Sequence, residues 1–329
     1  MADSDSPFAI RFHESGGPEV LAREPIAVGE PPSWHVRLRQ EAVGLNFIDT
    51  YFRTGLYPVD LPAGLGNEAA GVVEAVGDGV TDFQPGDRAG YFTGPVGAYA
   101  THRLVEADRL VKLPDGISSE EAAAAMLKGC TAEYLIERCA RVEPGQAVLV
   151  HAAAGGVGSI AVQWLQSIGA KVIAHSGSSD KARLAAEFGA YVSLNCPMEQ
   201  LAAQVREATS GEGVSVVLDG VGAASWEASL AAVARRGLVV SYGNASGPVP
   251  SFSPLDLMRR GSIFVTRPTL ADYCATPEAM RASAARLFDM MLSGRVKIRI
   301  GARYPLAETA EAHRALETRA TTGSTVLIP

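Results

Sequence analysis

A glycine-rich stretch at residues 152–158 gives the clearest indication of the chemistry that this sequence can perform. Gly155 and Gly158 occupy the second and third positions of the G-x-G-x-x-G fingerprint, while Ala153 occupies the first. Such a turn lets backbone N–H groups approach phosphate oxygens, and the N-terminus of a following helix favours negative charge. The stretch therefore predicts a site for the pyrophosphate of a dinucleotide, formed by Ala154, Gly155, Gly156, Val157 and Gly158.

The elements expected around this turn support that interpretation. Residues 147–151 form a short apolar run typical of a buried parallel strand, residues 159–166 continue as a helix, and residues 171–174 give a second strand. This order of strand, glycine turn, helix and strand is the context that the fingerprint requires. A tight strand-to-helix turn in some other doubly wound protein is the alternative.

The end of the second strand indicates which dinucleotide is bound. An NAD site places Asp or Glu about 20 residues after the glycines to bond the ribose 2′-OH, but here small hydroxylic residues and Lys181 follow the strand. Hydroxyls and a cation suit a 2′-phosphate, although Lys181 could also be a solvated helix-surface lysine. Asp180 is interpreted as the N-cap of the next helix. The sequence predicts NADPH, held here by Ser176, Gly177, Ser178 and Lys181.

The composition excludes several classes of protein. The chain has 329 residues, enough for two domains, with 47% hydrophobic and 20% charged residues, as in folded globular proteins. A formal net charge of −7 and the lack of a Lys/Arg run argue against a nucleic-acid partner. No apolar run has membrane-spanning length. The acidic N-terminus lacks a secretory pattern and the four cysteines are scattered, which favours a reduced, cytoplasmic protein.

The pattern of elements changes along the chain and predicts two domains. Short β-like runs broken by glycine and proline, such as residues 88–92, extend to about Pro114. Strands and helices then alternate to about Val265, with further strands expected at 214–219 and 238–242. The expected fold class is α/β, with a Rossmann-type doubly wound parallel sheet at 128–265 and a β-rich catalytic domain formed by 1–127 and 266–329.

Several sequence motifs, spread over nearly the whole chain, are informative when taken together. They lie at residues 44–51, 53–58, 64–71, 127–129, 151–158, 265–268 and 319–324. Together they resemble the quinone oxidoreductases of the zeta-crystallin type, a zinc-free branch of the medium-chain dehydrogenase/reductase superfamily. The resemblance implies a GroES-like catalytic domain, a Rossmann-type domain and a homodimer. It also implies an NADPH-dependent reductase that acts on quinones.

The residues at two positions bear on whether a metal is bound. Zinc alcohol dehydrogenases of the same superfamily look similar here but place cysteine at the position of Asn46 and histidine at that of Asn67. A catalytic zinc needs three thiolate, imidazole or carboxylate ligands, and an amide is a poor substitute. Asp49 and Glu68 remain, but two carboxylates do not complete such a site. The sequence therefore predicts no metal.

Without a metal to polarise a carbonyl, a quinone is the favoured acceptor because it is already electrophilic. The protein must then hold the ring against the nicotinamide and exclude water. Asn46 offers an amide donor and acceptor. Tyr51 and Tyr57 offer an aromatic wall with hydroxyls, unless they only pack at a domain edge, and Asp49 orients a neighbour or caps a helix. The expected catalytic residues are Asn46, Tyr51, Tyr57 and Asp49.

The resemblance implies further dinucleotide contacts, which follow by position in this sequence. Asn46 can bond the nicotinamide carboxamide. Lys128 matches a lysine near the nicotinamide ribose and phosphates, with an ordinary surface lysine as the alternative. Arg319 could reach the phosphate of the adenine ribose, with a solvated arginine as the alternative. Cys196 stands where the family commonly has a tyrosine, which makes the preference for NADPH over NADH less strict. Residues at the ends of later strands complete the expected site: Gly220, Tyr242, Gly243, Asn244, Val265, Thr266 and Arg267.

The sequence leaves three hypotheses about the function open. Reduction of a quinone, most readily an ortho-quinone, is the leading hypothesis, by a one- or a two-electron route. A zinc-free reductase of activated alkenes such as enals and enones would use the same cofactor. A structural or RNA-binding role is the non-enzymatic alternative, and the acidic balance opposes RNA binding. The implied homodimer could join through strands near Val239 and Val265.

Overall fold

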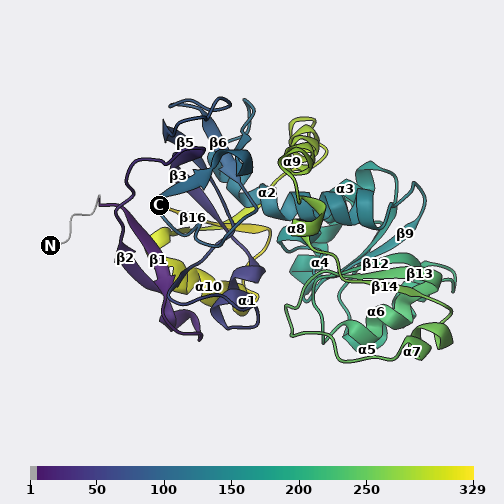
Figure 1. The fold of residues 1–329 in the computed structure, drawn as a ribbon. Coiled ribbons are helices and arrows are strands. Elements are labelled where there is room, and N and C mark those ends of the chain that lie inside the picture. Colours follow the sequence, from purple (N-terminus) through teal and green to yellow (C-terminus); the bar gives the residue numbers. More distant parts are fainter. Residues whose placement is uncertain (1–5) are drawn as a thin grey trace. The chain divides into compact units, whose positions relative to one another are not determined.

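The computed structural model describes residues 6–329, and its two compact units are described separately below (Figure 1). Residues 1–5, on which the expectation about a secretory signal partly rests, lie outside this range. The first unit holds the described residues up to Lys128 with Cys274–Leu292 and Ile298–Pro329. The second unit holds Gly129–Tyr273 and Ser293–Lys297. The boundary expected at 265/266 therefore precedes the one found after Tyr273.

The first unit is built on a seven-stranded sheet of order β15-β16-β3-β5-β6-β8, in which β7 also pairs with β3. The pairs are antiparallel except for β15 with β16. A smaller sheet has the order β2-β1-β4. The strands of this unit are β1 (Phe8–Phe12), β2 (Ala22–Pro25), β3 (His35–Leu45), β4 (Ala63–Gly64), β5 (Glu68–Val76), β6 (Arg88–Tyr91), β7 (His102–Glu106), β8 (Val111–Lys112), β15 (Ile300–Pro305) and β16 (Ser324–Ile328).

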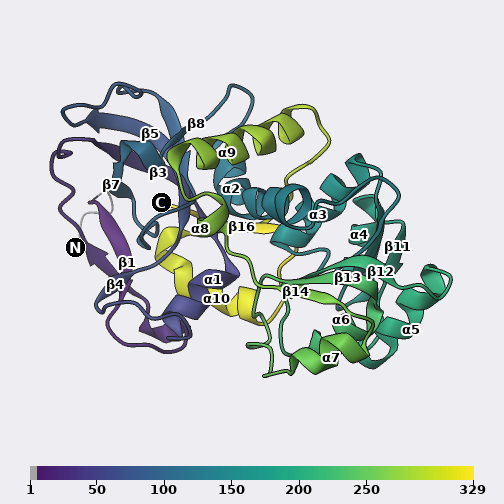
Figure 2. The same ribbon diagram turned by 45° about the vertical axis from the view of Figure 1, so that its right-hand side comes forward.

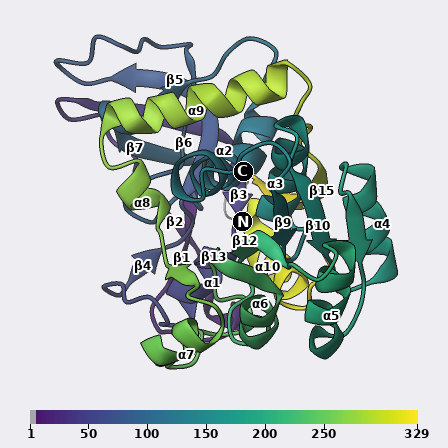
Figure 3. The same cartoon turned by 90° about the vertical axis from the view of Figure 1, so that its right-hand side faces the viewer.

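The core of the first unit includes Phe12, Leu38 and Leu65, all fully buried, and residues of α1 and α10 pack with it. The helix α1 begins after Asn46 because the Asp49 Oδ2 accepts the Asn46 N–H at 2.8 Å. Figure 3 shows the longest helix, α9, along its length. The helical segments are η1 (Pro18–Val20), α1 (Phe47–Arg53), η2 (Ala107–Arg109), α2 (Ser119–Glu133, of which the residues after Lys128 belong to the second unit), α9 (Pro277–Leu292), η4 (Leu306–Glu308) and α10 (Thr309–Glu317).

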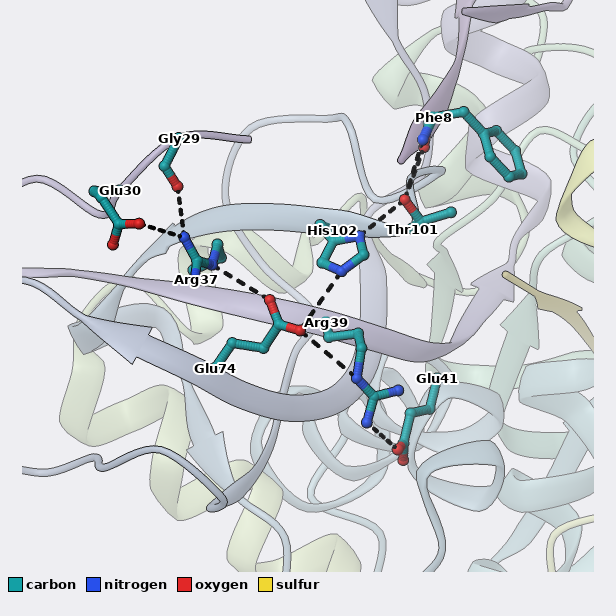
Figure 4. Close-up of polar contacts among 9 residues, drawn as sticks. All are labelled: Phe8, Gly29, Glu30, Arg37, Arg39, Glu41, Glu74, Thr101 and His102. Carbon is teal, nitrogen blue, oxygen red and sulfur yellow. Dashed lines mark hydrogen bonds and ion pairs between the residues drawn. The ribbon is translucent and has the colours of Figure 1, made fainter. Parts of the chain in front are cut away.

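A cluster of ion pairs crosses the strands β3, β5 and β7 (Figure 4). The Glu74 carboxylate forms ion pairs at 3.3 Å from the Arg37 Nε, 3.8 Å from the Arg39 Nε and 3.6 Å from the His102 Nε2. The Glu74 side chain is 31% exposed. Ion pairs so close to solvent contribute little to stability, so this cluster organises the sheet surface and is not a buried site.

The second unit contains one six-stranded sheet of order β11-β10-β9-β12-β13-β14, and every pair in it is parallel. The three central strands β10, β9 and β12 are mostly apolar and buried, as expected for strands covered on both faces of a parallel sheet. Figures 1 and 2 show α3 on one face and α5 and α6 on the other, which confirms the doubly wound fold. The strands are β9 (Ala147–Val150), β10 (Lys171–His175), β11 (Val192–Leu194), β12 (Val214–Asp219), β13 (Val233–Ser241) and β14 (Phe264–Thr266).

Most local predictions in this unit are confirmed, but the strand expected at 238–242 is part of the longer β13, which begins at Val233, and one cap is wrong. The strand expected at 214–219 is β12, and the turn at 152–158 leads into α3 as expected. Asp180 is not the N-cap of α4: Ser178 caps it by accepting the Lys181 N–H, because the helix begins one residue before Asp180. The helical segments of this unit are η3 (Tyr134–Cys139), α3 (Gly156–Ser167), α4 (Ser179–Glu187), α5 (Met198–Ala208), α6 (Trp226–Ala232), α7 (Pro254–Arg259) and α8 (Leu270–Tyr273). None of the helices within residues 6–329 is both long and apolar enough to span a membrane.

Candidate active site

The glycine turn joins β9 to α3, and its geometry depends on Gly158. Gly155 is the N-cap of α3 in an extended conformation. A Cβ on Gly158 would overlap the carbonyl oxygen of Ala152 and lie 2.8 Å from the Ala153 Cα. The helix therefore packs against the turn backbone to backbone. Its first N–H groups lack partners within the helix, which suits them to bind an anion.

The carboxyl edge of the same sheet carries buried hydroxyls and open space. Ser176 follows β10 and Ser241 ends β13, and neither hydroxyl oxygen has a hydrogen-bond partner within the described residues. Both residues are buried. A Cβ on Gly177 would meet no atom of the described residues within 4 Å. Buried polar atoms are normally satisfied, so these hydroxyls and this space fit a ligand that carries phosphate and hydroxyl groups.

Other residues expected to contact the dinucleotide lie at strand ends of the second unit. A Cβ on Gly220 would lie 2.8 Å from the Tyr242 ring, so the structure brings these two predicted residues together. The Cys196 carbonyl accepts from His175 at 3.0 Å, and Arg267 donates to the Pro268 carbonyl at 2.9 Å. Val265 and Thr266 lie on the edge strand β14.

The sequence did not indicate the buried cluster that supports this edge. The Asp219 carboxylate, at the end of β12, accepts the N–H groups of Val221 and Gly222 and the hydroxyls of two serines, Ser225 and Ser229. His151 bonds Ser229 at 2.9 Å, and burial lowers its pKa to about 4, which keeps it neutral. The cluster fixes the loop after β12. Its members are far apart in the sequence, so no local motif announced it.

In the first unit, Asn46 belongs to a buried polar group centred on Glu68. The Glu68 Oε1 accepts from the Asn46 Nδ2 at 2.7 Å and from the Lys128 Nζ at 2.8 Å, and its Oε2 accepts the Leu127 N–H at 2.7 Å. Glu68 is fully buried and Lys128 is 4% exposed. Lys128 is therefore not a surface lysine, and the amide N–H of Asn46 is directed to Glu68.

A second buried group is centred on Asp49. Its Oδ2 accepts from the Tyr99 hydroxyl at 2.8 Å, and its Oδ1 accepts from the Asn67 Nδ2 at 2.9 Å. Tyr99 also contacts the His313 Nε2 at 3.1 Å, and the His313 Nδ1 lies 2.8 Å from Arg53. Burial raises the pKa of Asp49 to about 6 and lowers the pKa of His313 to about 3. Asp49 thus caps α1 and orients a neighbour, as expected.

The two predicted tyrosines lie together in the first unit, which also contains Arg319. The Tyr51 and Tyr57 rings meet edge to face with centroids 5.3 Å apart, and Phe52 packs on Tyr57 at 5.7 Å. Tyr51 is 7% exposed. Arg319 follows α10 and has a φ of 58°. The tyrosine pair has the form of an aromatic wall.

Opposite pKa shifts at Asp49 and His313 predict a pH effect on stability. Asp49 has a raised folded pKa, so its contribution is lost as pH rises from 3.8 to about 6, whereas that of His313 is lost as pH falls from 6.5 to about 3. Each has a limiting slope of about 1.4 kcal/mol per pH unit, so the two cancel near pH 4–6. We expect the unfolding free energy of wild type minus that of His313→Gln to rise with pH across this interval in urea titrations. A difference independent of pH would contradict this assignment.

The donor set around Asn46 and Asn67 does not fit zinc. Both amides turn their N–H groups to carboxylates, Asn46 to Glu68 and Asn67 to Asp49, and those carboxylates are already engaged by other donors. Zinc ligands present lone pairs from thiolate, imidazole or carboxylate groups. Across residues 6–329, no three His, Cys, Asp or Glu side chains gather in an arrangement suited to a metal ion.

Family models and known proteins place the chain in one family. Residues 32–115 match the alcohol dehydrogenase GroES-like domain, and residues 156–285 match the zinc-binding dehydrogenase family. A quinone oxidoreductase of Pseudomonas aeruginosa is 50% identical over 97% of this chain and 99% of its own length. The Escherichia coli quinone oxidoreductase, whose structure is a complex with NADPH, is 44% identical with a TM-score of 0.96, covering 98% of this chain and 100% of that one.

Another relative has a different name. The 2-haloacrylate reductase of a Burkholderia species is 40% identical over 98% of both chains. A structure with the name 2-haloacrylate reductase superposes with a TM-score of 0.86, covering 98% of this chain and 99% of that one. The similarity to quinone oxidoreductases covers both units and both family models. The chain therefore belongs to the quinone oxidoreductase family of the medium-chain dehydrogenase/reductase superfamily.

Proposed function

We propose that this protein is an NADPH-dependent quinone reductase. The observation that carries the proposal is the full-length similarity, at 44–50% identity, to quinone oxidoreductases from three bacteria. The hydroxyls of Ser176 and Ser241, which find no hydrogen-bond partner among residues 6–329, and the glycine turn support a dinucleotide in the second unit. Oxidation of NADPH on addition of an ortho-quinone tests the proposal, and the absence of turnover with several quinones would contradict it.

The residues that would hold NADPH in the second unit are those of the turn and the sheet edge. The N–H groups at the start of α3 bind the pyrophosphate, and the region around Ser176, Gly177 and Lys181 receives the 2′-phosphate. Gly220 and Tyr242 line the strand ends that follow. We retain the further contacts as part of this proposal: Asn46, Lys128, Ala154, Val157, Ser178, Cys196, Gly243, Asn244, Val265, Thr266, Arg267 and Arg319.

When bound, NADPH supplies the hydride for the reduction. Conversion of a quinone to a hydroquinone takes one hydride and one proton, and we assign the proton to solvent. Tyr51 and Tyr57 hold the flat ring of the substrate and exclude water from it. Asn46 contributes a fixed amide, held by Glu68 at 2.7 Å, so that no reorientation is needed during the reaction. Asp49 is a positioning residue in this scheme.

Lys181 provides the sharpest test of the 2′-phosphate site. We expect Lys181→Ala to weaken NADPH binding roughly 10- to 100-fold, because a hydrogen bond to a charged group contributes about 1.5–3 kcal/mol, and to leave NADH binding nearly unchanged. Equilibrium titration with both dinucleotides measures this. Lys171→Ala is the matched control, since Lys171 is the first residue of β10 and lies at the amino end of that strand, away from the carboxyl ends that are assigned to the dinucleotide. Equal losses for NADPH and NADH would refute the role of Lys181.

Reduction of activated alkenes is the second candidate function. The similarity to a 2-haloacrylate reductase, 40% identical over 98% of both chains, favours it specifically. An alkene conjugated to a carboxylate or carbonyl accepts a hydride at carbon and a proton at the neighbouring carbon, with the same cofactor. Steady-state rates with an ortho-quinone and an enone of similar size separate the two functions. Faster enone turnover would reverse our ranking.

We also propose a cytoplasmic homodimer. The four cysteines are free thiols, as expected for a reducing compartment. The outer edge of β14 is a strand edge, on which Phe264 is 62% exposed, and strand edges are suited to pair with a second copy. Sedimentation velocity at assay concentration tests this arrangement, and a monomer would contradict it.

A further inference from the structure

The hydrogen bonds around Asp49 have a single direction, which follows from the chemistry of each group. Arg53 can only donate, so the His313 Nδ1 accepts its N–H at 2.8 Å. Neutral His313 must then carry its proton on Nε2 and donate it to the Tyr99 oxygen at 3.1 Å. The Tyr99 hydroxyl in turn donates to the Asp49 Oδ2 at 2.8 Å. Every link in this buried chain points towards Asp49.

The same argument fixes the amide of Asn67. The Asp49 Oδ2 is occupied by the Tyr99 hydroxyl and by the Asn46 N–H at 2.8 Å, and the Oδ1 faces the Asn67 amide at 2.9 Å. An ionised carboxylate accepts hydrogen bonds only. Asn67 must therefore turn its Nδ2 inward. Its carbonyl oxygen, Oδ1, then faces away from Asp49 on a half-buried side chain.

We propose that Asn67 is a specificity-determining residue, and that Asp49 positions it so that its carbonyl oxygen accepts a hydrogen bond from a hydroxyl group on the substrate ring. This inference rests on the proposed quinone reductase function and deepens it. An acceptor at this place favours ring systems with a free hydroxyl, including the hydroquinone product, over the same rings with the oxygen methylated. The Arg53–His313–Tyr99 chain acts behind it by keeping Asp49 an acceptor.

Replacing one carboxylate oxygen of Asp49 by an NH₂ group is expected to reverse the orientation of the Asn67 amide. In Asp49→Asn, the Tyr99 hydroxyl and the Asn46 N–H still need an acceptor, so the new amide keeps its oxygen towards them and turns its NH₂ to Asn67. Asn67 must then rotate to offer its own oxygen inward and its NH₂ outward. The outward group becomes a donor. In Asp49→Asn combined with Asn67→Asp, the residue at 67 again presents an oxygen, and the original preference is expected to return.

The experiment compares two ligands by equilibrium titration of the enzyme saturated with NADP⁺, without oxygen. The ligands are a naphthohydroquinone and its dimethyl ether, which differ in whether the oxygen can donate. We expect wild type to prefer the hydroquinone roughly three- to tenfold, the range of one net hydrogen bond. Asp49→Asn is expected to abolish or invert this ratio, and Asn67→Leu to remove it. Asp108→Asn, an exposed carboxylate of the first unit, is the control and should keep the wild-type ratio.

The outcomes are decisive in both directions. An unchanged ratio in Asp49→Asn or in Asn67→Leu overturns the inference, and the second variant serves if the first fails to fold. Failure of the double variant to restore the preference also counts against it. The proposed function is tested separately by NADPH oxidation with a plain quinone in wild type. A wild-type enzyme that lacks this activity would refute the proposed function. The ratio of the affinities for the hydroquinone and its dimethyl ether tests only the role of Asn67.

Discussion

The Glu68→Ala variant is expected to lose about 3–5 kcal/mol of unfolding free energy, because breaking a buried ion pair leaves an uncompensated charge. Glu68 is fully buried and accepts from Lys128, Asn46 and the Leu127 N–H at 2.7–2.8 Å. In this variant, Lys128 no longer has a carboxylate beside its ammonium group, and the residue is only 4% exposed to solvent. Urea unfolding of the purified variant measures the loss.

Another glutamate of the same strand provides the matched control. Glu74 lies on β5 as Glu68 does, but its side chain is 31% exposed, and its partners Arg37, Arg39 and His102, drawn in Figure 4, have side chains that are 21–45% exposed. We expect Glu74→Ala to cost no more than about 1 kcal/mol, the upper range for exposed pairs. Equal losses for the two alanine variants would show that burial of the Glu68–Lys128 pair does not govern the stability of this region.

The Gly158→Ala variant is expected to weaken NADPH binding by at least about a hundredfold, or about 2.7 kcal/mol. A methyl group at this position would overlap the carbonyl oxygen of Ala152 and lie 2.8 Å from the Ala153 Cα. Helix α3 must then move away from the turn, which removes its first N–H groups from the phosphate. Crowding of the backbone also costs about 1–3 kcal/mol of unfolding free energy. Calorimetric titration with NADPH and urea unfolding measure the two effects.

The Gly177→Ala variant separates the effect of a methyl group on NADPH binding from its effect on stability. A Cβ at Gly177 would have no atom of residues 6–329 within 4 Å, and the residue does not have a positive φ. We expect its unfolding free energy to change by less than about 0.5 kcal/mol, the usual range for surface substitutions. NADPH affinity should still fall, because the methyl group enters the space assigned to the dinucleotide. Unaltered affinity in Gly177→Ala would place the cofactor elsewhere, and unaltered affinity in Gly158→Ala would remove the turn from the site.

Features that arise from short stretches of sequence were predictable. The strand at 214–219 is bounded as expected, since a run of β-branched and apolar residues ends at Asp219. The glycine turn was recognised because strand, turn and helix follow each other without interruption. The fold class followed from the alternation of such elements, and from a resemblance that extends over the chain.

Features that depend on distant residues were not predictable from the sequence. Tyr99 bonds Asp49 from a position 50 residues away, and His313 bonds Tyr99 from a position 214 residues away. No periodicity links the three residues. The Lys128–Glu68 pair spans 60 residues in the same way. The cap of α4 was misplaced because Ser178 and Asp180 are both good caps, and only the observed start of the helix at Ser179 selects between them.

The most direct test of the account is one rapid-mixing measurement. Enzyme treated with a chelator and loaded with NADPH is mixed with an ortho-quinone in the absence of oxygen, while the nicotinamide absorbance and the metal content are recorded. We predict one NADPH oxidised for each quinone reduced to hydroquinone, at a rate that added zinc does not raise. No oxidation until a divalent ion is supplied would contradict the account.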